Sequence, residues 1–249
     1  MKADLKNYVE QFLEDYIKGT SKGSINNAIR SQKIIDHIHQ YAVDYLKSKN
    51  VKNSYIKRNR KCQGFFKVKE QDILITKSDK KICTEPEISI NVRSQMSSIQ
   101  KNFDTLYERL IAESVNLHKQ YKYLPCGYIY LIPTLGLDSS ALKKGKFKPN
   151  ESYDLEKYIS SFYKITGRKS VKGDDFKYES IGLIIIDIRP NNSFEIINDL
   201  KYLNEIGRIS DQFVRDFNSK FMRLDPFKTI DTLLEIYGQR NDINEIIQK

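Results

Sequence analysis

Cysteine is scarce in this sequence, and tryptophan is absent altogether. The 249 residues include three cysteines, three methionines and three histidines. Cys62, Cys83 and Cys126 are odd in number and widely spaced, without a CxxC pair. This pattern argues against a secreted disulfide framework and against a cysteine-rich metal site, and it is typical of reduced thiols in a cytoplasmic protein.

Long apolar runs are also missing. No uninterrupted apolar stretch approaches the roughly 18 residues that a membrane-spanning helix requires. The first residues, MKADLKNYVE, contain no apolar core of the kind found in a signal peptide. We therefore expect neither a membrane span nor a secretory leader, and we predict a cytoplasmic location.

Acidic side chains are missing from one stretch of the chain. Residues 47–69 contain nine basic side chains and no acidic one, with Tyr55, Phe65 and Phe66 interleaved. Residues 141–177 form a second basic region, with ten basic and five acidic side chains. The net charge of +10 favours a polyanionic partner. A solvated loop is the ordinary alternative for such a charge run.

The remaining composition is sufficient for one hydrophobic core. Hydrophobic residues make up 39% of the chain, and 16 tyrosines and 12 phenylalanines supply much of the bulk. At this length one domain with insertions is more typical than two. We expect N-terminal helices in residues 1–50, a core at 64–132, and a sheet extension with C-terminal helices at 133–249.

Residues 64–132 carry the clearest pattern. Asp72 stands at the head of the apolar run 73–76, which predicts a buried strand. Residues 87–93 alternate strictly, with apolar residues on one face and polar residues on the other. Helical spacing over 97–121 and an apolar run over 127–132 complete the order strand, strand, helix, strand. A further buried strand is predicted at 182–188.

This order resembles the core of the PD-(D/E)XK nucleases, in particular the XhoI-type restriction endonucleases. Four segments carry the resemblance: GFFK leading to QDIL (64–74), NVRSQ (91–95), KNF with a later Glu108 (101–108), and GYIYL (127–131). The resemblance implies an α/β, restriction-endonuclease-like fold. Such a fold has a central mixed sheet flanked by helices, here with extra helices at both termini.

The resemblance also implies a metal site. In the resembled family an Asp and a Glu on adjacent strands hold Mg²⁺, with Mn²⁺ as a substitute, and a nearby Lys orients the attacking water. Asp72 matches the Asp, whereas Asn91 stands at the Glu position and Arg93 at the Lys position. The Asn91 amide oxygen can ligate a cation but adds no charge, and Arg93 cannot act as a base.

Glu108, on the following helix, is the candidate for the missing carboxylate. An exposed helix charge is its plain alternative. We expect Asp72, Asn91 and Arg93 to cluster at one edge of the sheet, with Glu108 on the adjacent helix.

Duplex DNA is the partner that the resemblance implies. Basic side chains of both runs would contact phosphates, namely Lys57, Arg58, Arg60, Lys61, Lys67, Lys143, Lys144 and Lys146. Ser94, Gln95 and Asn102 would read base edges. The resemblance further implies a two-fold homodimer and leaves room for a cognate DNA methyltransferase in the same system.

Three functions stay open on the sequence. The first is an endonuclease that hydrolyses phosphodiester bonds with Mg²⁺. The second is a DNA-binding protein that keeps the nuclease scaffold without cleavage, as a silent subunit, a regulator or an inactivated variant. The third sets the resemblance aside and is a basic α/β protein that binds RNA or another protein. His37 and His39 do not share a helix face, and His118 stands alone, so surface or packing roles are expected for all three.

Overall fold

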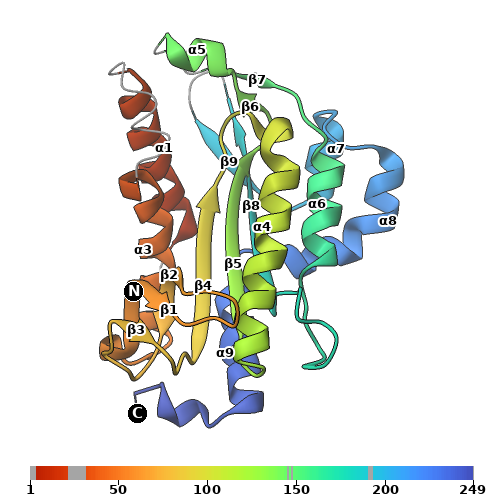
Figure 1. Ribbon diagram of the computed structural model, residues 1–249. Coiled ribbons are helices and arrows are strands. Elements are labelled where there is room, and N and C mark those ends of the chain that lie inside the picture. Colours follow the sequence, from red (N-terminus) through yellow and green to blue (C-terminus); the bar gives the residue numbers. More distant parts are fainter. Residues whose placement is uncertain (1–3, 22–31, 145, 147, 190–192, 249) are drawn as a thin grey trace.

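A seven-stranded mixed β-sheet forms the centre of the protein (Figure 1). The computed structural model describes residues 4–21, 32–144, 146, 148–189 and 193–248. The strand order is β3-β1-β2-β4-β5-β8-β9. The strands are β1 (Ile56–Cys62), β2 (Lys69–Ile75), β3 (Ile82–Cys83), β4 (Ile88–Ser94), β5 (Cys126–Pro133), β8 (Ser180–Ile188) and β9 (Phe194–Ile197).

The sheet combines an antiparallel part and a parallel part. β1, β2 and β4 are antiparallel neighbours, and the short β3 lies parallel to β1. β4, β5 and β8 run parallel, and β9 closes the sheet in the antiparallel sense. A separate two-stranded ladder joins β6 (Gly136–Leu137) to β7 (Pro149–Glu151). The α/β class with a central mixed sheet is therefore confirmed.

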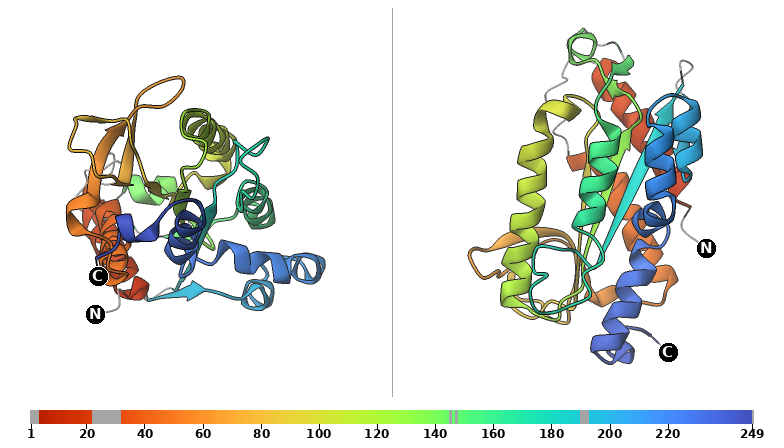
Figure 2. Two further views of the ribbon diagram at one scale, coloured as in Figure 1. Left: turned by 90° about the horizontal axis from the view of Figure 1, so that it is seen from below. Right: turned by 90° about the vertical axis from the view of Figure 1, so that its right-hand side faces the viewer.

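Helices cover both faces of the sheet, as Figure 2 shows from two further directions. One face packs against α1 (Leu5–Ser21), α3 (Gln32–Ser48) and α9 (Thr229–Arg240). The other face packs against α4 (Ile99–Gln120), α6 (Leu155–Lys164), α7 (Leu200–Glu205) and α8 (Asp211–Phe221). The shorter helices are α5 (Ser139–Lys143) and the 3₁₀ turns η1 (Asn53–Tyr55), η2 (Met222–Leu224) and η3 (Ile243–Glu245). Among the described residues, no helix has both the length and the apolar content needed to cross a bilayer.

The alternation in β4 determines which of its residues face which helices. Ile88, Ile90 and Val92 are buried in the core beneath α1, α3 and α9, as predicted. β5 and β8 are buried on both faces, which explains their continuous apolar runs. The helix expected over 97–121 forms as α4. The carboxylate of Glu151 on β7 accepts the Ser98 and Ile99 N–H groups at 2.8 and 3.1 Å, so it stabilises the first turn of α4.

One segment differs from the sequence expectation, and part of a second lies outside the described residues. Residues 56–62 of the basic run form strand β1, whereas no strand was predicted there, because its charged residues hide the alternation. The second N-terminal helix, expected from residue 26, is α3 from Gln32, and residues 22–31 lie outside the described part of the chain.

Candidate functional site

Asp72 and Asn91 lie side by side, as the strand pattern predicted. Backbone pairing between β2 and β4 runs from Ile75↔Ile88 to Ile73↔Ile90. Beyond that point side chains join the strands: the Asp72 N–H donates to Asn91 Oδ1 at 3.0 Å, and the Val92 N–H donates to Asp72 Oδ2 at 2.7 Å. The Asp72 carboxylate therefore lies between β2 and β4, at the place where side chains instead of backbone pairs join the two strands; we call this place the seam.

The Asn91 side-chain amide uses both of its ends in hydrogen bonds that join β2 to β4 at the seam. It is 7% exposed, and its Nδ2 donates to Gln71 Oε1 at 2.9 Å. The same Gln71 oxygen accepts a hydrogen bond from Ser89 Oγ at 2.8 Å. With both ends of its amide engaged, Asn91 retains only one free lone pair on Oδ1 for any cation.

Asp72 faces a buried histidine that the sequence did not connect with it. His39 of α3 is 4% exposed, and its Nε2 lies 3.8 Å from Asp72 Oδ2. Its Nδ1 lies 3.6 Å from Asp36 Oδ1, and within the described residues neither ring nitrogen forms a hydrogen bond. Burial lowers the pKa of His39, so the ring is neutral near pH 7 despite its two carboxylate neighbours.

The pKa of Asp72 reflects its place between several groups. Burial raises this pKa, while the hydrogen bond from Val92 and the charge of Arg93 lower it. Glu113 of α4 adds to the rise by repulsion. The charges of Arg93 and Glu113 therefore both influence the pKa of Asp72, although its carboxylate lies between β2 and β4.

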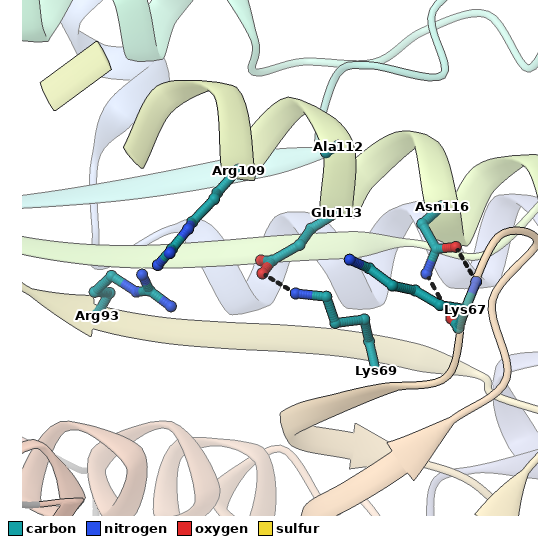
Figure 3. A pocket seen from close by; sticks show the side chains of 7 residues that line it. All are labelled: Lys67, Lys69, Arg93, Arg109, Ala112, Glu113 and Asn116. Atoms are coloured by element: carbon teal, nitrogen blue, oxygen red, sulfur yellow. Dashed lines mark hydrogen bonds and ion pairs between the residues drawn. The ribbon is translucent and has the colours of Figure 1, made fainter. Parts of the chain in front are cut away.

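A cleft of about 430 Å³ lies between α4 and the strands β2 and β4 (Figure 3). We call it the basic cleft, and its lining consists of Lys67, Lys69, Arg93, Arg109, Ala112, Glu113 and Asn116. Glu113, the acid in this lining, accepts an ion pair from Lys69 at 3.2 Å. Within the described chain, the guanidinium groups of Arg93 and Arg109 form no hydrogen bond or ion pair. The cleft therefore presents two arginines without a hydrogen-bonded partner, and the nearby charges of Glu113 and Asp72 compensate Arg93 only in part.

A second hollow of about 290 Å³ adjoins the basic cleft and shares Arg93 and Arg109 with it. Ser94, Gln95 and Asn102, the expected base-reading residues, line this hollow. Gln95 is already engaged: its Oε1 accepts the Tyr130 hydroxyl at 2.6 Å and its Nε2 donates to the Ser98 carbonyl at 3.2 Å. Asn102 is exposed, and its Nδ2 donates to the same carbonyl at 3.0 Å.

Glu108 does not line either hollow and is exposed on α4. Glu113 holds the place beside Arg93 that was expected of Glu108. The helical periodicity of α4 alone indicates that Glu113, and not Glu108, lies near the buried face of the helix. At about 100° per residue, Glu108 lies about 180° from Ile99 and Leu117, whereas Glu113 lies about 40° from Leu117.

The predicted phosphate contacts fall into two groups. Lys57 pairs with Asp79 at 2.6 Å, Arg58 pairs with Asp36, and Arg60 donates to the Lys80 carbonyl at 3.0 Å. Lys61 is exposed and Lys67 lines the basic cleft, so these two stay accessible.

The second basic region lies far from the first. Lys144 and Lys146 are exposed, and the side chain of Lys143 lies outside the described part. Figures 1 and 2 place α5, which immediately precedes Lys144, at the opposite end of the molecule from β1 and β3. One short DNA segment therefore does not contact both basic regions at the same time.

A buried charge network occupies the other end of α4. The ligand atoms of His118, Cys126 and Glu179 lie within 4.8 Å of one another. Glu179 accepts from Arg168 Nη1 at 3.0 Å, from Arg240 Nη1 at 2.7 Å and from the Cys126 N–H at 2.8 Å. Two guanidinium groups already compensate this carboxylate, and thiol and imidazole ligands do not suit Mg²⁺. We therefore interpret the cluster as a structural ion network.

His118 completes the network as a cation. Its Nε2 lies 3.2 Å from Glu179 Oε2, and its Nδ1 lies 3.1 Å from the Asp175 carbonyl. Burial alone would lower the pKa of His118, but its contacts with Cys126 and Glu179 outweigh burial and raise the pKa to about 10. The sequence left His118 without a partner because Glu179 is 61 residues away.

Comparison with known proteins adds no identification. No protein-family model, no curated protein and no solved structure matches this chain.

Proposed function

We propose that this chain is a nuclease-like DNA-binding protein whose basic cleft holds backbone phosphates. The observation that carries the proposal is the unpaired state of Arg93 and Arg109, which face the cleft together with Lys67 and Lys69. A guanidinium group binds a phosphate through two parallel hydrogen bonds. Because neither guanidinium forms a direct ion pair or hydrogen bond within the described residues, a phosphate can bind both without displacing a bonded partner.

The topology supports the same proposal. The order β2, β4, α4, β5 is the strand–strand–helix–strand order on which the nuclease resemblance rests. In that arrangement the candidate residues Asp72, Asn91 and Arg93 stand on the two neighbouring strands β2 and β4. Of these three residues, Arg93 lines the basic cleft, which lies between these strands and α4.

Hydrolysis is a second candidate, favoured by the position of Glu113. Asp72, Glu113 and the Asn91 amide supply oxygen donors of the kind that Mg²⁺ and Mn²⁺ prefer. Asp72 would hold the ion; Glu113 influences Asp72 electrostatically and would have to leave Lys69 before it could contribute. A bound ion would polarise a phosphoryl oxygen. The donor set is weaker than a two-carboxylate site, since Asn91 is neutral and the four cationic side chains of the basic cleft stand nearby.

Further parts of the proposal rest on the resemblance and the composition. They are a two-fold homodimer on a palindromic site, a cognate DNA methyltransferase in the same system, and a cytoplasmic location. DNA binding is proposed ahead of RNA binding, because the candidate site belongs to a nuclease-like core.

The test measures binding and cleavage separately. Fluorescence anisotropy would compare duplex DNA, single-stranded DNA and RNA of one sequence at low and physiological salt. Preference for duplex DNA with steep salt dependence is expected. Preference for single strands or RNA would contradict the proposal. Incubation of plasmid DNA with Mg²⁺ or Mn²⁺, followed by end mapping, then decides whether the bound DNA is also cut.

A further inference from the structure

The loop between β1 and β2 exposes two phenylalanines to solvent. Phe65 is 57% exposed and Phe66 is 67% exposed, and Val68 beside them is 37% exposed. The two rings contact each other edge to face, with centroids 5.0 Å apart. Contiguous exposed aromatic side chains are uncommon on a free protein surface and mark contact sites.

The loop is held rigidly in this position by Asn116 of α4, which is 3% exposed. Asn116 Oδ1 accepts the Phe66 N–H at 2.8 Å, and its backbone carbonyl accepts the Phe65 N–H at 2.9 Å. Its Nδ2 donates to the Lys67 carbonyl at 3.0 Å. A Cβ on Gly64 would come within 2.0 Å of this amide, so only glycine fits there. The aromatic pair is therefore displayed by a fixed backbone.

The aromatic pair stands at the edge of the basic cleft. Lys67 follows Phe66 directly in the chain and lines the cleft, as does Asn116, which holds the loop. The loop that carries the two rings therefore borders the cleft through Lys67 and Asn116. A ligand with anionic groups joined closely to flat apolar rings matches this surface, and a nucleic acid has that chemistry.

We propose that Phe65 and Phe66 form a wedge that stacks on an exposed or unstacked base of DNA bound in the basic cleft. This inference rests on the proposed function. An aromatic wedge gains stacking free energy with a base, but it must first unstack that base from its neighbours, which costs free energy. This unstacking cost is smaller where one base is already unpaired, so the wedge favours a bulged or gapped duplex over a perfect one.

The test uses a short duplex with 2-aminopurine in a single-base bulge, because 2-aminopurine fluorescence responds to stacking. Wild-type protein is expected to change the fluorescence on binding. The double variant Phe65→Ala/Phe66→Ala is expected to lose that change and to bind the bulged duplex about fivefold to a hundredfold more weakly, the range for one stacked base. Phe65→Leu/Phe66→Leu keeps apolar bulk without rings and should also lose the response.

The control is Phe227→Ala, which removes a phenylalanine that is 38% exposed before α9. This variant should keep both the affinity and the fluorescence change. Unchanged behaviour of the Phe65→Ala/Phe66→Ala protein, with wild-type binding intact, would overturn the wedge and leave the proposed function standing. Failure of the wild-type protein to bind any DNA would instead remove the proposed function and the wedge with it. Sedimentation velocity of the free wild-type and Phe65→Ala/Phe66→Ala proteins shows whether the pair joins two copies of the chain; a dimer that only the wild type forms would also overturn the wedge.

Discussion

Replacing Glu179 with glutamine should destabilise the protein strongly. The carboxylate receives hydrogen bonds from two arginines and the Cys126 N–H, and it faces His118 at 3.2 Å. The variant leaves the cations of this buried network without their central anion. Removing one partner of a buried ion pair typically costs about 3–5 kcal/mol.

The pKa values support that magnitude. Burial would raise the pKa of Glu179, but the contacts with His118, Cys126 and Arg240 outweigh burial and lower it from 4.5 to about 2. At 1.36 kcal/mol per pKa unit, the shift corresponds to roughly 3 kcal/mol. For a chain of this size that loss lowers the melting temperature by about 2–4 °C for each kcal/mol.

The same network predicts the pH dependence of stability. Glu179 has a lowered pKa in the folded state, so its contribution is present above its unfolded pKa near 4.5 and is lost as the pH falls towards 2. His118 has a raised pKa, so its contribution is complete below about 6.5 and is lost as the pH rises towards 10. The contribution of Glu179 and His118 to the free energy of unfolding should therefore be greatest between pH 4.5 and 6.5.

Urea denaturation at several pH values tests this reasoning. Glu179→Gln should lower the free energy of unfolding at pH 6 and flatten its pH dependence. The matched control Glu10→Gln, at an exposed position on α1, should change it by no more than about 0.5 kcal/mol. A Glu179→Gln protein as stable as wild type at pH 6 would refute the structural role of the network.

Three further predictions concern the candidate site. Asp72→Ala should leave DNA affinity equal to or tighter than wild type in anisotropy titrations, since it removes a negative charge near the phosphates, and should abolish any metal-dependent cleavage; weaker binding would count against a site beside Asp72. Glu113→Gln should tighten DNA binding roughly fivefold by freeing Lys69 and relieving repulsion, whereas Glu108→Gln, outside the cleft, should not; equal effects would show that the cleft does not hold the DNA. If the wild type does not cleave DNA, Asn91→Glu/Arg93→Lys should introduce Mg²⁺-dependent nicking of plasmid DNA. A variant that also fails to cleave would count against the nuclease ancestry of the site.

The sequence predicted the parts of the fold that have a one-dimensional signal. The period of two in β4, the apolar runs of β5 and β8, and the helical spacing of α4 each follow from burial on defined faces. β1 escaped prediction because four of its seven residues are lysine or arginine, and part-buried ones such as Lys57 and Arg58 pair their charges with acids.

The candidate site was predictable only in part, because its contacts join distant segments. Asp72 and Asn91 were found through strand order, whereas the approach of His39 depends on how α3 crosses the sheet. Glu113 was within reach of periodicity, but the family motif pointed to Glu108 instead. Whether an arginine such as Arg93 is paired or free cannot be read from residue types, since it depends on which acids the fold brings within 4 Å.

The most direct test of the account is the salt dependence of DNA binding by an Arg93→Ala/Arg109→Ala variant. The logarithm of affinity falls with the logarithm of salt by about 0.9 for each phosphate neutralised, so losing two arginine contacts should reduce the slope by up to about 1.8. Arg189→Ala/Arg215→Ala, which removes two arginines from β8's end and α8, should keep the wild-type slope and affinity. The account predicts weaker binding and a shallower slope for the cleft variant alone. An Arg93→Ala/Arg109→Ala protein that binds duplex DNA with the wild-type affinity and slope would contradict it.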